Sequence, residues 1–217
     1  MSSLLEILSA HAPLLLLDAV STRVQVGLFD AQGTARWAVA DEEAGVALFR
    51  SVESLGIDLA SVRGFAFCEG PGSILGIRTA AMALRTWTAL ALRPVFAFRS
   101  LELVAYDLAR RGPAENFSVI ADARRNAWHS VEVSAGAAGP LRRVTAAELT
   151  GVLFMPEHFR TWATKPAETR TTGYDLATLL PRVSEADLFR ATDAPDAFLH
   201  EDPSYLTWTP RIHCAPS

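Results

Sequence analysis

The chain has 217 residues, of which 50% are hydrophobic and 20% are charged, a composition that indicates a folded globular protein and excludes an intrinsically disordered one. Its 20 basic and 24 acidic side chains leave a net charge of -4, so strong nucleic-acid binding by the chain alone is not expected. The length predicts one compact unit built from two lobes.

Three strands and a helix are predicted at the start of the chain. The apolar run at 14–18 predicts a buried strand, and the alternating residues of 24–28 predict a second. A third strand at about 35–39 would complete an antiparallel meander. Asp41 can then cap a helix over 42–55.

The next segments alternate between strand and helix. An almost uniformly apolar strand is expected at 62–68, and the turn at 69–73 leads into a long helix that reaches about Leu92. A short strand at 95–98 precedes a helix at 101–111, which Ser100 caps. The order βββαβαβα predicts a sheet that begins as a meander and then gains parallel strands through helical crossovers.

A break at Gly112-Pro113 divides the predicted lobes, which are 1–112 and a smaller, partly degenerate 113–217. The second lobe repeats part of the first, because an apolar strand again ends in an aspartate, Asp122. Its predicted elements are strands at 117–122 and 128–133 joined by a turn at 123–126, a capping box at 145–148 opening a short helix, a helix near 174–180, and an extended segment at 203–207.

Cysteine and histidine spacing gives no sign of a metal or redox site. Cys68 and Cys214 form no Cys-x-x-Cys pair, and Cys68 is expected to be a buried, inert thiol. The five histidines are too widely spaced for a paired-histidine motif, so no metal is expected. The run Leu14–Leu17 is too short for a membrane span and follows no Lys or Arg, so we expect a cytoplasmic protein without membrane association.

The segment from Glu69 to Arg78, Glu-Gly-Pro-Gly-Ser-Ile-Leu-Gly-Ile-Arg, has the most informative local pattern. Its glycines permit a tight bend and a close approach, and the start of the following helix offers amide groups to an anion or phosphate. No Lys-Ser or Lys-Thr follows, which excludes a Walker loop. An ordinary strand-to-helix turn would explain the same residues. The candidate site residues here are Gly70, Pro71, Gly72, Ser73, Gly76 and Arg78.

The segment Gly70–Arg78 resembles the GPGSFTGxR signature of the TsaB (YeaZ) family, bacterial proteins of tRNA threonylcarbamoyladenosine biosynthesis in the glycoprotease-like superfamily. The resemblance continues in chain order. Residues 14–28 are similar to the family's opening hairpin, 100–102 to its Ser-Leu-Glu helix start, 119–124 to its Asp-Ala-Arg strand, and 203–206 to its terminal Pro-x-Tyr-Leu segment.

The resemblance implies an α/β protein with the actin, sugar-kinase and Hsp70 (ribonuclease H-like) fold, whose two lobes are each built on a mixed sheet with helices. It also implies a non-catalytic subunit without a cofactor. Such a subunit pairs with a TsaD-type protein, and with a TsaE-type ATPase in a larger complex, to transfer threonylcarbamoyl to the adenosine beside the anticodon of tRNA. Alone it would form a homodimer, and it would meet tRNA only through the complex.

Several positions depart from the family pattern. Ile74-Leu75 stand in place of Phe-Thr in the signature, Asp18-Ala19-Val20 in place of Asp-Thr-Ser, and Thr207 in place of the terminal Arg. Two of these changes remove or displace a hydroxyl that could meet a phosphate. We therefore expect weak nucleotide binding, at best, by the isolated chain.

Asp18 and Asp122 end the first strands of the two lobes, where kinases of the superfamily place Mg²⁺-ATP. A second hypothesis is therefore a small-molecule kinase or ATPase that uses Asp18, Gly72 and Asp122, and a third is a diverged homodimeric protein outside the pathway. Against the kinase, the turn after Asp18 lacks glycines that could cradle phosphates. The two aspartates could equally be polar strand ends. Arg124, at the predicted hairpin tip, could contribute to a tRNA-facing surface.

The helix that follows Ser73 has small or apolar residues on nearly every face. A helix that covers one side of a sheet should carry a polar opposite side, so we expect this one to meet a partner together with the 42–55 helix. The alternative is a helix enclosed within its own chain. The predicted partner-facing residues are Leu48, Val52, Ala80, Ala83, Leu84 and Trp87.

Overall fold

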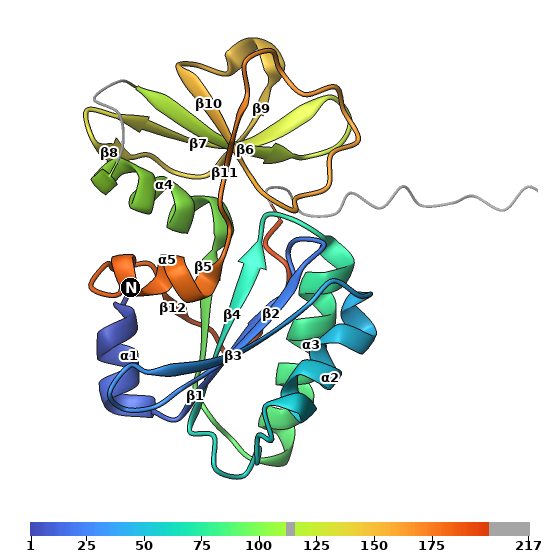
Figure 1. Ribbon diagram of the computed structural model, residues 1–217, viewed down its shortest axis with the longest axis vertical. Helices are drawn as coiled ribbons and strands as arrows, with labels where there is room; N and C mark the ends of the chain where they lie inside the picture. The colour runs from blue at the N-terminus through green and yellow to red at the C-terminus, as the bar shows by residue number, and fades with distance from the viewer. Residues whose placement is uncertain (112–115, 200–217) are drawn as a thin grey trace, which may run out of the picture.

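The computed structural model describes residues 1–111 and 116–199, which form two lobes (Figure 1). The first lobe contains a mixed sheet with the strand order β12-β5-β4-β1-β2-β3. These strands are β1 Leu14–Asp18, β2 Val24–Phe29, β3 Ala35–Ala40, β4 Gly64–Gly70, β5 Val95–Arg99 and β12 Arg190–Ala191.

The first five strands have the predicted arrangement. β1, β2 and β3 form an antiparallel meander, and β4 and β5 then add in parallel beside β1. The helices are α1 Leu4–His11, α2 Ala44–Ser54, α3 Ile74–Leu90, α4 Ser100–Arg111 and α5 Leu176–Val183. α2 and α3 lie together on one flank of the first sheet, α1 lies on the other, and α4 stands between the lobes (Figure 1).

The second lobe is a smaller sheet with the order β11-β10-β6-β7-β8, to which β9 adds by pairing with β7. β6 and β7 form an antiparallel hairpin, whereas β10 runs parallel to both β6 and β11. The elements are β6 Phe117–Asp122, β7 Ala127–Ser134, β8 Ala137–Ala138, β9 Arg142–Thr145, a 3₁₀ turn η1 Ala146–Glu148, β10 Val152–Pro156 and β11 Arg170–Thr172.

After β11 the chain returns to the first lobe. α5 packs against α4, and β12 pairs antiparallel with the edge strand β5. The predicted division put everything after residue 112 in the second lobe, so it misplaces this returning segment. The reason is that a two-residue strand is too short to carry a periodic signal. The predicted boundary at Gly112-Pro113 and the segment 203–207 lie outside the described residues.

The other differences from the predicted elements are one helix that was not predicted and several shifted element ends. α1 is absent from the predicted elements, although Ser3 and Glu6 form a reciprocal capping box at its start. Asp41 does not cap α2, which begins at Ala44 without a side-chain cap; Asp41 pairs instead with Arg23 at 3.3 Å. Several element ends lie two residues from their predicted positions: β4 covers 64–70, α2 begins at 44, α3 ends at 90 and α5 begins at 176. Cys68 is buried, as predicted.

Candidate functional site

The signature turn joins β4 to α3 and packs against the turn between β1 and β2. A Cβ added to Gly72 would lie 2.3 Å from the backbone oxygen of Val20, and one added to Gly76 would lie 2.0 Å from that of Ala19. Both distances are far below any real contact, so a side chain is excluded at these two positions. The close approach that these glycines permit is therefore to the chain's own backbone.

Hydrogen bonds lock the turn in this place. The Ser73 amide donates to the Val20 oxygen at 2.6 Å, and the Ser73 hydroxyl accepts from the Gly76 amide at 3.4 Å as the N-cap of α3. The Ser100 hydroxyl donates to the Pro71 oxygen at 2.8 Å. Ser100 is thus the first residue of α4 and also ties that helix to the signature turn.

Asp18, predicted as a phosphate- or metal-proximal group, is fully buried. The Tyr174 hydroxyl donates to its carboxylate at 2.6 Å, and the Val20 amide donates at 3.2 Å. Burial raises the pKa of Asp18 from 3.8 to about 6, although the two hydrogen bonds act to lower it. A carboxylate covered in this way by Tyr174 cannot reach a ligand in the space between the lobes.

The raised pKa gives a testable pH dependence. Between about pH 4 and pH 6 the folded chain holds a proton on Asp18 that the unfolded chain has lost, so this group makes the protein less stable as pH rises. Asp18→Asn cannot ionise, so its stability relative to wild type should rise by about 2 kcal/mol between pH 4 and pH 7. Urea unfolding at both pH values measures this difference. Asp193→Asn, at an exposed position, is the control for the loss of one negative charge. If the stability of Asp18→Asn differs from that of the wild type by the same amount at both pH values, the prediction is wrong.

Asp122 binds backbone amides from two separate segments. One carboxylate oxygen accepts from the Arg124 amide at 2.6 Å, and the other accepts from the amides of Trp162 at 2.6 Å and Ala163 at 2.8 Å. Burial alone would raise the pKa of Asp122, but these donors and the Arg124 charge lower it below its usual range. Asp122 therefore holds the β6–β7 hairpin tip against the loop at 160–163.

A cavity of about 190 Å³ lies between the signature turn and this hairpin tip. The Arg124 guanidinium carbon is 4.1 Å from the ring centroid of Trp162, which is 55% exposed at the cavity wall. The structure thus brings together four predicted site residues, Pro71, Gly72, Asp122 and Arg124, and adds residues that were not predicted to belong to the site. The added lining residues are Ile74, Ile77, Ala123, His129, Arg143, Trp162, Phe198 and Leu199.

Arg78 lies outside this cavity. Its guanidinium is 3.9 Å from the carboxylate of Asp196, which also pairs with Arg85 at 3.2 Å. Asp196 belongs to the returning segment, which a further bond fastens beside the turn: the Phe198 amide donates to the Glu69 oxygen at 2.8 Å. Arg78, predicted as a candidate site residue, therefore pairs with a carboxylate of this chain. No local pattern in the sequence could have paired residues so far apart.

The predicted partner-facing residues need correction. Leu48, Val52, Ala80, Ala83 and Leu84 are buried inside the first lobe, where they pack α2 and α3 against each other and the sheet, and Trp87 is half-buried. Of these six residues, only Ala83, which is 5% exposed, and Trp87 line the outer groove between the two helices. Ile74 and Leu90 are exposed at the two ends of α3. The other exposed large apolar side chains of the two helices are Val46, Phe49, Leu75 and Met82. Together with Trp87 they are called the α2–α3 face below.

The site offers few groups for catalysis. Asp18 and Asp122 both use their oxygens in internal hydrogen bonds. Burial raises the pKa values of Cys68 and Tyr174, so the thiol and the phenol stay protonated at neutral pH. Within residues 1–111 and 116–199, no group of three His, Cys, Asp or Glu side chains could hold a metal ion. No helix in the same residues is both long and apolar enough to cross a membrane.

Comparisons with known proteins found solved structures with a similar architecture. No protein-family model matches the chain, and no curated protein matches it. Among solved structures it is similar to YeaZ from Pseudomonas aeruginosa, with 20% identity, a TM-score of 0.55, and 80% of this chain aligned to 89% of that one. It is also similar to "an uncharacterized protein with similarity to peptidase YEAZ from Pseudomonas aeruginosa", with 19% identity, a TM-score of 0.57, and coverage of 95% and 100%.

At these identities the similarity establishes the fold, and it does so over nearly the whole length of both structures. The predicted fold class is confirmed. The chain is an actin-like α/β protein of two lobes, each built on a mixed sheet, with the architecture of the YeaZ structures.

Proposed function

We propose that this chain is a TsaB (YeaZ)-type subunit, a non-catalytic partner of a TsaD-type protein in the transfer of threonylcarbamoyl to tRNA. The signature-like segment 70–78 and the two strand-end aspartates support the proposal, and so does a fold that is similar to YeaZ structures over most of its length. A TsaE-type ATPase joins the larger complex in this proposal, and tRNA is met only through that complex in the cytoplasm.

The observation that carries the proposal is the α2–α3 face. Its residues other than Val46 line a shallow groove of about 430 Å³, with Phe49 and Trp87 in an edge-to-face contact at 6.4 Å and Met82 56% exposed beside them. A contiguous exposed apolar patch of this kind is typical of a surface that another protein covers. The residues that line the groove are Phe49, Leu75, Arg78, Thr79, Met82, Ala83, Thr86 and Trp87.

The occupied carboxylates support a role without catalysis. A kinase of this fold would need Asp18 at the ligand, but Tyr174 covers that group and hydrogen-bonds to it. A peptidase would need an activated nucleophile or a metal-bound water, and the described part of the chain offers no metal-binding cluster. We therefore propose no peptidase activity for this chain.

Co-expression with the TsaD-type protein of the same organism tests the proposal. We expect the two chains to co-purify, and Met82→Glu to weaken the pairing by at least about tenfold, because it places a charge in the apolar groove. Leu5→Glu is the matched control, since Leu5 is similarly exposed but lies on α1, on the opposite flank of the first sheet. Both variants should keep the unfolding midpoint of the wild type.

The outcomes separate the three hypotheses. Failure of the wild-type chain to pair at low salt would discredit the proposal, and a homodimer that Met82→Glu dissociates would then favour the diverged homodimeric protein. Calorimetric binding of ATP and Mg²⁺ to the isolated chain would favour the kinase. In cells, deletion of the gene should lower the threonylcarbamoyladenosine content of bulk tRNA. Expression of the Leu5→Glu variant in the deletion strain should restore that content, whereas expression of Met82→Glu should not.

A further inference from the structure

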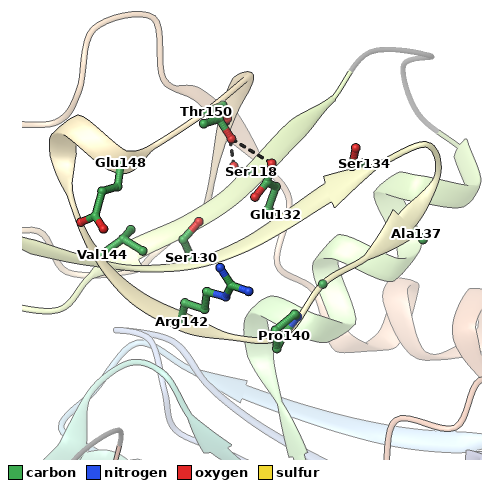
Figure 2. A pocket seen from close by; sticks show the side chains of 11 residues that line it. Ser118, Ser130, Glu132, Ser134, Ala137, Pro140, Arg142, Val144, Glu148 and Thr150 are labelled. Atoms are coloured by element: carbon green, nitrogen blue, oxygen red, sulfur yellow. Dashed lines mark hydrogen bonds between the residues drawn. The ribbon is translucent and has the colours of Figure 1, made fainter.

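A second pocket, separate from the space between the lobes, lies on the second sheet. Its volume of about 320 Å³ is at the lower end of the range for small-molecule sites, about 300–1,000 Å³. The antiparallel register places Ser118, Ser130 and Glu132 on one face of β6 and β7, and the pocket is open on that face (Figure 2). The lining residues are Ser118, Ser130, Glu132, Ser134, Ala137, Gly139, Pro140, Arg142, Val144, Glu148 and Thr150.

Small hydroxyl side chains make the pocket's floor. The Ser118 hydroxyl donates to the Thr150 oxygen at 2.9 Å, and the Thr150 hydroxyl donates to Glu132 at 3.1 Å. Ser130 is 7% exposed, points into the pocket (Figure 2), and makes no side-chain hydrogen bond within the described part of the chain. A water-facing sheet surface usually carries long side chains, whereas serines here leave a hollow with an available hydroxyl.

Charges of both signs surround this floor without pairing. Arg142, next to Ser130 across the β7–β9 ladder, extends its guanidinium into the pocket, with the carboxylates of Glu132 and Glu148 on different sides of it (Figure 2). Among residues 1–111 and 116–199, no ion pair joins Arg142 to either carboxylate. Thr145 occupies one oxygen of Glu148, and Thr150 occupies one of Glu132. The guanidinium of Arg142 and the carboxylates of Glu132 and Glu148 therefore surround one polar space, and each carboxylate accepts these hydrogen bonds on only one of its oxygens.

We propose that this pocket binds a small zwitterion, with the ligand's carboxylate on Arg142, its ammonium group on Glu132, and Ser130 as a further hydrogen-bond partner. A guanidinium is suited to a carboxylate, and a carboxylate to an ammonium group. The lining has no aromatic ring on which a sugar or a base could stack, and two acidic side chains disfavour a phosphate. The ligand chemistry that remains is that of a free α-amino acid or a short peptide with both termini charged.

Calorimetric titration of the full chain at low ionic strength tests this inference. The zwitterions are glycine, L-serine and glycylglycine, and acetate and ethanolamine are probes with one charge each. We expect at least one zwitterion to bind about tenfold more tightly than either single-charge probe, because only the zwitterion meets both charges. The two charges are closer together in glycine than in glycylglycine. Whichever of the two binds more tightly therefore shows which charge separation fits the pocket, and so distinguishes a free amino acid from a peptide.

Variants connect binding to the named residues. Arg142→Gln and Glu132→Gln should each weaken zwitterion binding by at least about tenfold, and Ser130→Ala should weaken it less. Both charged residues are exposed, so the variants should keep the wild-type unfolding midpoint. Arg125→Gln, which removes an arginine outside the pocket, is the matched control and should bind normally. The inference is overturned if no zwitterion binds at millimolar concentration, if acetate or ethanolamine binds equally well, or if Arg142→Gln leaves binding unchanged.

Discussion

Gly76→Ala is expected to abolish stable folding of the chain. The new methyl group would lie 2.0 Å from the backbone oxygen of Ala19 and 3.1 Å from its carbonyl carbon. Because these are backbone atoms at the end of a central strand, they cannot turn aside as a flexible side chain can. Relief of the clash requires α3 to move away from β1, which would open the core of the first lobe. We expect the free energy of unfolding to fall by at least about 4 kcal/mol, which is typical of severe steric defects.

Gly45→Ala is the matched control, because Gly45 is also helical but has no atom within 4 Å of an added Cβ. That variant should be as stable as the wild type or more stable by up to about 1 kcal/mol, since alanine favours the helix. Urea unfolding and the soluble yield of both variants measure the effect. If Gly76→Ala unfolds at the wild-type midpoint, the contact between the signature turn and the β1–β2 turn is wrong.

Asp122→Asn is expected to destabilise the protein by roughly 2–3 kcal/mol. The wild-type carboxylate accepts three backbone amides on its two oxygens. An asparagine has one oxygen, so its NH₂ group must face at least one amide donor, which loses its bond at a site that is 8% exposed. The hairpin tip that carries Arg124 and the loop that carries Trp162 would then no longer be held together.

The pH dependence of this effect has the opposite sign to that of Asp18. The pKa of Asp122 is lowered in the folded chain, so its stabilisation is present above the unfolded pKa and is lost as pH falls through the folded pKa. Urea unfolding should therefore show a smaller gap between wild type and Asp122→Asn in acid than at pH 7. Asp41→Asn is the control, because its surface pair with Arg23 contributes at most about 1 kcal/mol. Equal effects of the two variants at pH 7 would refute the assigned role of Asp122.

Much of the first lobe could be predicted because its signals are local. An apolar run such as 14–18 or a helix stop at a glycine depends on neighbouring residues, and five strands of the first sheet appear in the predicted order. α1 carried a readable signal as well, in the capping box of Ser3 and Glu6 before the apolar Leu4, Ile7 and Leu8. The prediction was therefore wrong at α1, although the sequence carries a local signal for this helix. β12, with two residues, had no such signal.

The predicted partner-facing residues show a different limit. α3 is apolar or small around most of its circumference, so its sequence could not tell which side meets the sheet and which faces outward. Packing against α2 and the sheet buried Ala80, Ala83 and Leu84 and left Met82 exposed. The exposed side was therefore decided by the tertiary structure.

The sequence by itself determined the order of the strands and helices in the first lobe, the signature turn, and the aspartates at the ends of two strands, because each depends on residues that are neighbours in the chain. Tertiary structure decided what these features contact. Gly76 is required by the oxygen of Ala19, and Asp18 is covered by Tyr174, which comes 156 positions later. The physical reason is that burial and hydrogen bonding depend on which distant segments meet, and a local pattern of residue types does not specify that meeting.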